Sequence, residues 1–120
     1  MSDPRERRRF PRVPSEFPLR YRQIPVVRPG YHDASVEDVS FGGVRFRSSD
    51  DVRVRSSMLF ELLIPGAQPV HAFGRVAWVV ERPDRDGFEI GGTFEEQSTT
   101  TLRAIRQHLQ RENAHAHAGL

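Results

Sequence analysis

With 120 residues, 37 % of them hydrophobic, the chain is long enough for one domain with a single core. It has no cysteine, which excludes disulfides, thiolate nucleophiles and thiolate-bound metals. All 18 basic residues are arginines; eight of them fall within residues 1–28 against three acids, so this part carries +5 and the remainder −3. This distribution indicates an anionic partner for the N-terminal part.

The chain also lacks the apolar segments that membrane proteins and secreted proteins need. Its densest apolar run, residues 58–64, is interrupted by Glu61 and is far shorter than the roughly 20 residues of a spanning helix. No apolar stretch follows the positively charged N-terminus, so a secretory signal is not expected. The sequence therefore predicts no membrane insertion and a cytoplasmic location.

The first 18 residues are rich in arginine and proline. Pro4, Pro11, Pro14 and Pro18 each remove an amide donor and restrict the residue before them. We therefore expect residues 1–18 to form a flexible, extended basic arm, and not a helix or a central strand.

Beyond the arm, short segments alternate between apolar and polar residues and are separated by turn-forming residues. The predicted strands cover residues 19–26, 31–40, 43–47, 57–64, 70–81 and 87–94. Six strands in about 75 residues would expose two long edges unless the sheet closes on itself. A mainly β fold is therefore predicted: a six-stranded antiparallel barrel.

After residue 94 the spacing of the apolar residues changes from the period of two typical of a strand to that of a helix. Leu102, Ile105 and Leu109 recur at helical spacing, with Ser98 or Thr99 as N-cap, so residues 97–112 are predicted to form one amphipathic helix on the barrel. The predicted organisation is an arm, a barrel with its C-terminal helix and a disordered tail, over residues 1–18, 19–112 and 113–120 respectively.

A second unusual cluster is VEDVSFGGVRF, residues 36–46. Strand alternation places Asp38 and Ser40 on one face, with Val39 and Phe41 on the other. Gly42 and Gly43 follow, which indicates either a bulge with positive φ or a backbone that a ligand approaches closely. An aspartate suits the donor edge of a guanine, namely its ring N–H and exocyclic amine.

The arginines of the arm complement that aspartate. Guanidinium groups bind phosphate bidentately, bind the O6/N7 edge of guanine and stack on flat rings. Arg8 and Arg12 are four residues apart, about 13 Å in an extended segment, which is enough to reach two groups on one ligand.

Together, the RxxxR motif at residues 8–12 and the DxSxxG motif at residues 38–43 resemble the PilZ domain family of bacterial cyclic di-GMP receptors. GRVAWVVE, FEIGGTFEE and the closing helix resemble the later part of such a domain, so the likeness covers about residues 6–110. The resemblance implies a PilZ-like barrel that binds cyclic di-GMP and signals to an unidentified partner protein in motility, exopolysaccharide or biofilm control. It implies no catalytic residues and no catalytic cofactor.

The resemblance also assigns the ligand-binding residues. Arg8 and Arg12 would take phosphates and guanine acceptor edges, Asp38 and Ser40 would hold a guanine, and Gly43 would permit its approach. Further candidates flank these positions: Arg7, Arg9, Gly42 and Trp78. An arginine before RxxxR, here Arg7, favours two intercalated cyclic di-GMP molecules per domain in this family.

Other interpretations remain open from the sequence. The arm could be a solvated basic tail, Asp38 and Ser40 could cap a hairpin corner, and Trp78 could be a core residue. The five histidines lack zinc-ligand spacing, so no metal site is expected. The rival functions are a nucleic-acid-binding barrel and a protein-interaction module that no longer binds nucleotide. The −3 charge of the body disfavours DNA or RNA as the partner.

Overall fold

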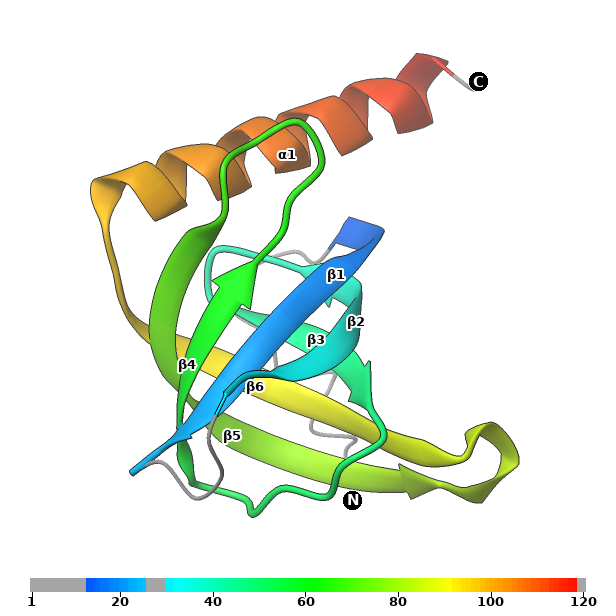
Figure 1. The fold of residues 1–120 in the computed structure, drawn as a ribbon. Coiled ribbons are helices and arrows are strands. Elements are labelled where there is room, and N and C mark those ends of the chain that lie inside the picture. Colours follow the sequence, from blue (N-terminus) through cyan, green and yellow to red (C-terminus); the bar gives the residue numbers. More distant parts are fainter. Residues whose placement is uncertain (1–12, 26–29, 119–120) are drawn as a thin grey trace.

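The computed structural model describes residues 13–25 and 30–118, which form a closed six-stranded antiparallel barrel with one long helix (Figure 1). The strands are β1 (Val13–Ile24), β2 (His32–Val39), β3 (Gly43–Ser48), β4 (Ser57–Leu62), β5 (Val70–Arg82) and β6 (Gly87–Gln97). Around the barrel they run in the order β1-β2-β3-β6-β5-β4. The predicted fold class is confirmed.

β1 begins earlier than the sequence predicted. It starts at Val13, which pairs with Val39 of β2, so residues 13–18 belong to the barrel and not to an arm. Pro18 is tolerated because its carbonyl accepts a hydrogen bond from Leu63 N (3.1 Å), just beyond the last residue of β4. The nitrogen of a strand residue points to the same side as its carbonyl, so Pro18 removes no donor from the β1–β2 ladder.

Helix α1 (Thr99–Ala118) packs across one end of the barrel against β1 and β5 (Figure 1). Ser98 is the N-cap: its Oγ accepts from Thr101 N at 3.1 Å. The predicted tail at residues 113–120 is wrong as far as Ala118, because no glycine or proline interrupts the helix before Gly119. Within residues 13–25 and 30–118, no helix has the length and apolar character of a membrane span.

The buried face of α1 differs from the predicted one. Ile105 is fully buried as expected, but Leu102 and Leu109 are only partly buried. Thr101 and His108 are buried instead, and the His108 ring meets Phe17 of β1 edge-on, with ring centroids 5.2 Å apart. The face of the helix that packs on the barrel is therefore more polar than the spacing of its leucines predicted.

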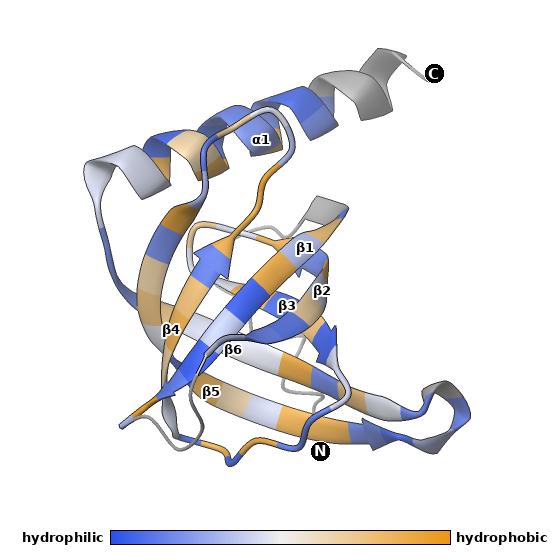
Figure 2. Cartoon of the chain, viewed as in Figure 1, coloured by the Kyte–Doolittle hydropathy of each residue, from blue (hydrophilic) through white to orange (hydrophobic). Residues whose placement is uncertain are grey.

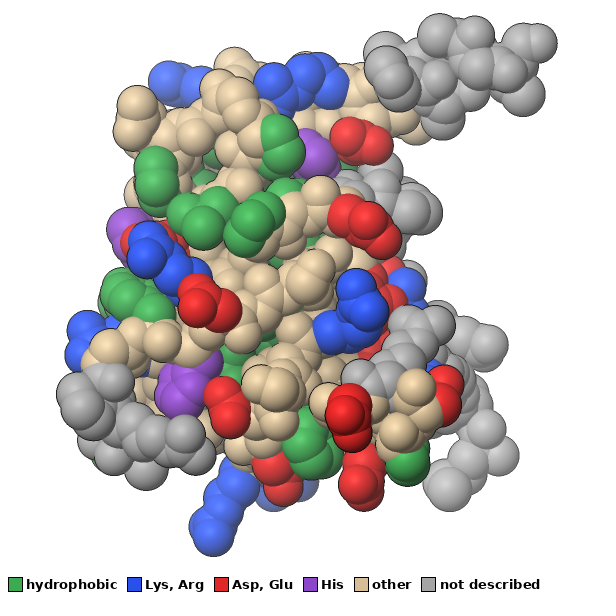
Figure 3. All heavy atoms as spheres, turned by 45° about the vertical axis from the view of Figure 1, so that its right-hand side comes forward, with side chains coloured by type: hydrophobic (Ala, Val, Ile, Leu, Met, Phe, Trp, Pro, Cys, Tyr) green, Lys and Arg blue, Asp and Glu red, His purple; other side chains and the backbone are tan. Residues whose placement is uncertain are grey.

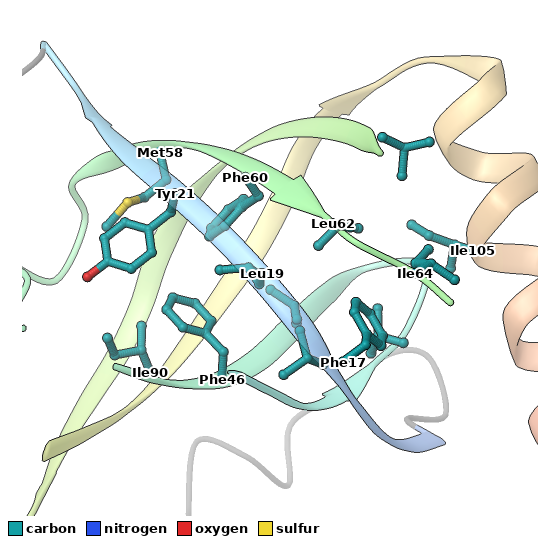
Figure 4. Close-up of a cluster of buried hydrophobic side chains, with 14 of the residues drawn as sticks. Phe17, Leu19, Tyr21, Phe46, Met58, Phe60, Leu62, Ile64, Ile90 and Ile105 are labelled. Carbon is teal, nitrogen blue, oxygen red and sulfur yellow. The ribbon is translucent and has the colours of Figure 1, made fainter. Parts of the chain in front are cut away.

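The core fills the barrel interior with aliphatic and aromatic side chains from every strand (Figure 4). Hydrophobic and hydrophilic residues alternate along the strands, as Figure 2 shows. Neighbouring aromatic rings link Tyr21 to Phe46, Phe46 to Phe60 and Phe60 to Phe94, with centroids 5.6–6.0 Å apart. Since the interior is packed, a ligand site has to lie on the outside of the barrel.

Candidate functional site

The DxSxxG segment forms the tight corner between β2 and β3. Ser40 N donates to Gly43 O (2.9 Å), and Gly42 N donates to Ser40 Oγ (3.2 Å). Ser40 is 2 % exposed, so its hydroxyl shapes the corner in the way that the capping interpretation expected. Gly42 and Gly43 do not have the positive φ that the sequence analysis considered for them. Among the described glycines, Gly30 and Gly66 have a positive φ.

A β-bulge decides which way Asp38 points. Val36 pairs with Phe46 and Asp38 with Arg45, so Glu37 is an extra residue on β2. Val36 and Val39 enter the core, whereas Asp38 lies opposite the outward-facing Arg45. The predicted separation of Asp38 from the core-facing Val39 is confirmed.

Asp38 belongs to a network of ion pairs centred on Arg45. Its Oδ2 lies 2.7 Å from Arg45 Nε, and its side chain is only 5 % exposed. The guanidinium of Arg45 also contacts Glu89 Oε1 at 3.1 Å and Glu37 Oε2 at 3.7 Å. Arg82 binds the other oxygen of Glu89 at 3.1 Å. The network holds the Asp38 carboxylate in one orientation at the rim of the corner.

Sequence reasoning missed Arg45, Glu89 and Arg82. Alternation along residues 43–48 would place Arg45 on the outer face, but only the strand register shows that it lies opposite Asp38. With Arg47, which binds Glu37 at 3.2 Å, the network contains as many guanidiniums as carboxylates. Basic and acidic side chains are similarly mixed on the face drawn in Figure 3.

Trp78 lies in the same cross-strand row as Asp38. The row runs from Asp38 to Arg45, Gly91 and Trp78 on four successive strands. The indole lies against Gly91, where a Cβ would overlap it, and Trp78 is half-buried outside the core. Its ring is therefore an outer-surface aromatic close to the network, and the core interpretation is wrong.

The remaining predicted site residues are those of the arm. Arg7, Arg8, Arg9 and Arg12 lie outside the described residues. The described chain nevertheless begins beside the corner, because Val13 pairs with Val39 and Pro14 with Asp38. Arg12 therefore directly precedes a residue that lies opposite the DxSxxG segment.

Comparisons with known proteins agree with this architecture. The model of the PilZ domain family matches residues 6–111. The structure resembles the PilZ domain of YcgR from Escherichia coli, solved with c-di-GMP, with a TM-score of 0.75, 13 % identity and coverage of 94 % of this chain and 96 % of that one. No curated protein matches the sequence significantly.

Two longer proteins contain the same fold. The Bacillus subtilis inhibitor of motility (MotI/DgrA) aligns with a TM-score of 0.74 and 14 % identity over 94 % of this chain, and MrkH of K. pneumonia with 0.73 and 16 % over all of it. The chain spans about half the length of these two proteins, 56 % and 53 % respectively. At such identities the likeness shows the fold, while the family match covers most of the sequence. The chain belongs to the PilZ domain family.

Proposed function

We propose that this chain is a cyclic di-GMP receptor that binds its ligand between the RxxxR segment and the corner at residues 38–43. The observation that carries the proposal is the pairing of Pro14 with Asp38 in the β1–β2 ladder. Opposite residues of an antiparallel pair have Cα atoms about 4.5–5.5 Å apart. The chain that directly follows the arginines therefore enters the barrel beside the carboxylate.

The short stretch of chain before Val13 would allow both motif arginines to reach the corner. Arg12 is one residue before Val13, and Arg8 is five residues before it, so its Cα lies at most about 18 Å from that of Val13. The two guanidiniums can thus meet one small ligand seated on the corner. A segment joined to the barrel at a distant strand could not do this.

The two halves of the proposed site differ in charge: the corner network is neutral, and the segment before β1 is positive. Guanidiniums and carboxylates balance in the described network, so the corner itself offers a dianion no net attraction. The positive charge has to come from residues 5–12, which contain five arginines and one glutamate. Asp38 would accept the guanine N–H groups while Arg45 keeps hold of Oδ2, because a carboxylate has room for several donors.

Trp78 extends the proposed site along the outer surface. Its half-buried indole could offer a face to a guanine or to an arm arginine. Arg7 precedes the motif, and we carry over the family expectation of two ligand molecules per domain.

Binding, and not catalysis, would be the output. The ligand would order the arm, cover positive charge with phosphates and present a changed surface to a partner protein. The neighbours support a role in motility or exopolysaccharide control: one is an inhibitor of motility, and another is the PilZ domain of CeSA from a cellulose-synthesizing bacterium. We carry over the predicted cytoplasmic location as part of this proposal.

Calorimetric titration of the chain with cyclic di-GMP tests the proposal. We expect a Kd in the micromolar range, about −8 kcal/mol, and a stoichiometry of two. Single-stranded RNA oligonucleotides of increasing length serve as the comparison. Binding that strengthens with oligonucleotide length and weakens steeply with salt, without binding of cyclic di-GMP, would instead identify a nucleic-acid-binding barrel.

A further inference from the structure

A groove of about 730 Å³ lies where β6 passes into α1. It is next to the residues at the end of β6 that hydrogen-bond to the corner. One wall is β5, with His71 and Phe73, and the other is the end of β6 with the first turn of α1. Figure 1 shows this end of β6 rising past β5 into the helix. Thr101 Oγ1 donates to His71 O at 2.7 Å and closes the floor between helix and strand.

The groove combines an exposed aromatic ring with carboxylates. Phe73 is 47 % exposed although it lies on a barrel strand, and it pairs directly with Glu96. Glu95 is an extra residue on β6, since Phe73 pairs with Glu96 and Gly74 with Phe94. This bulge lets two consecutive carboxylates, Glu95 and Glu96, face outward while Phe94 packs towards the core.

The two carboxylates differ in whether they form an ion pair with a described residue. Glu95 is held by Arg75 Nε, at 3.1 and 3.2 Å to its two oxygens. Glu96 is exposed and has no cationic partner among the residues that the structure describes. A free carboxylate directly beside an exposed phenyl ring matches the side chain of arginine or lysine, whose methylenes cover apolar surface and whose end is a cation.

We propose that this groove, the Phe73–Glu96 groove, docks a basic segment of a partner protein, with an arginine or lysine side chain laid over Phe73 and paired with Glu96. Charge complementarity selects a basic partner over an acidic one, and the exposed ring supplies an anchor of the kind enriched at interfaces. The groove then provides the surface through which this domain engages its partner.

The groove is connected to the DxSxxG corner through the end of β6. Gln97 lines the groove, and its Nε2 donates to Phe41 O at 3.0 Å. Phe94 N donates to Gly42 O at 2.9 Å. Residues 94–97 therefore contact the corner on one side and form a groove wall on the other. Provided the proposed function holds, cyclic di-GMP at the corner would alter the groove's affinity for its partner, and the partner would alter that for cyclic di-GMP equally.

Fluorescence anisotropy of a short fluorescein-labelled peptide of alternating arginine and leucine tests the groove. We expect the full chain to bind this peptide, and Glu96→Lys or Phe73→Ala to weaken binding about tenfold. The matched controls lie near the far end of β5: Glu81→Lys makes the same change of charge, and Val80→Ala truncates another exposed apolar residue. A peptide with glutamate in place of arginine should not bind.

Each further outcome decides between alternatives. Equal weakening of peptide binding by Glu96→Lys and Glu81→Lys would overturn the proposal. It would show that the acidic surface attracts the basic peptide without a specific site. No peptide binding, with a changed oligomeric state of Glu96→Lys in sedimentation, would reassign the groove to contacts between copies of this chain.

Adding cyclic di-GMP should change peptide affinity at least fivefold. No change in a chain that binds cyclic di-GMP would overturn the coupling. If the chain does not bind cyclic di-GMP but Glu96→Lys still weakens the peptide, the proposed function fails and the groove stands.

Discussion

Pro14 lies opposite Asp38 where β1 pairs with β2, so the residue two positions after the RxxxR motif lies directly beside the DxSxxG corner. β1 and β2 are consecutive strands, and their ladder extends to the pair of Val13 and Val39. Had β1 begun at Leu19, as its proline content indicated, the arginines would have been separated from the corner by a longer unpaired segment. The early start of β1 therefore shortens the stretch of chain between the arginines and the corner, which supports the proposed site.

The arm arginines should control ligand affinity. We expect Arg8→Ala or Arg12→Ala to weaken cyclic di-GMP binding at least tenfold, because each charge-assisted hydrogen bond contributes about 1.5–3 kcal/mol. Calorimetric titration measures the change, and the circular dichroism spectrum should stay that of the wild type. Arg106→Ala, on an exposed position of α1, is the control with the same loss of charge. A titration unchanged by either arm variant would contradict the proposed contacts.

Arg45 should matter for folding as well as for the site. Its guanidinium contacts Asp38 and Glu89, whose side chains are 5 % exposed, so Arg45→Met leaves two buried carboxylates without this cation. Because Arg45 itself is 25 % exposed, we expect a loss of about 2–3 kcal/mol in the free energy of unfolding, below the range for fully buried pairs. Urea denaturation measures it.

A second substitution separates charge from packing at this position. Adding Asp38→Asn to Arg45→Met neutralises one of the two carboxylates that lost this cation and should recover part of the lost stability. Arg106→Met, exposed on α1, should change the urea midpoint little. An Arg45→Met midpoint equal to that of Arg106→Met would show that the network does not stabilise the fold.

Gly91 should control the position of Trp78. A Cβ at residue 91 would overlap the indole, so Gly91→Ala displaces the ring or strains the strand, at a cost of about 1–3 kcal/mol. Since Trp78 is the only tryptophan, its fluorescence reports the displacement directly. We expect a shifted emission maximum and weaker cyclic di-GMP binding. Trp78→Ala separates the two effects: affinity equal to the wild type would show that the ring does not contact the ligand.

Local sequence patterns were sufficient to predict the closed barrel, the helix and a cap at Ser98 or Thr99, of which the structure has Ser98. Alternation with period 2 and a hydroxyl before a helical period follow from backbone geometry over a few residues. The start of β1 could not be predicted in this way. Proline is excluded from a strand only where its nitrogen faces a paired neighbour, and Pro18 faces the side just beyond the end of β4.

The outward faces near the site were harder to predict because β-bulges interrupt the alternation. Extra residues at Glu37, Ala77 and Glu95 each shift the phase of a strand by one position. The placement of Trp78 beside Gly91, and the two outward carboxylates beside Phe73, both depend on such a bulge. Each of these bulges lies between two strands that are consecutive in the chain, but it depends on which residues of the two strands pair, so the pattern within one strand does not identify it.

His108 should make stability depend on pH. Burial lowers the pKa of this imidazole below its usual 6.5; Glu112 opposes the shift in part and Arg111 adds to it. Between the lowered pKa and 6.5 the unfolded chain binds a proton that the folded chain does not, so the free energy of unfolding falls as the pH is lowered through this window. Above about pH 7 the contribution of His108 is constant.

His108→Gln tests this dependence by removing the titrating group from the α1–β1 contact with Phe17. Urea denaturation of both proteins from pH 5 to pH 8 gives the difference in their free energies of unfolding. We expect this difference to favour the wild type and to be constant between pH 7 and pH 8, because both side chains are then neutral. It should shrink as the pH falls below 6.5. A difference that stays constant down to pH 5 would show that His108 does not titrate differently in the folded and unfolded chains.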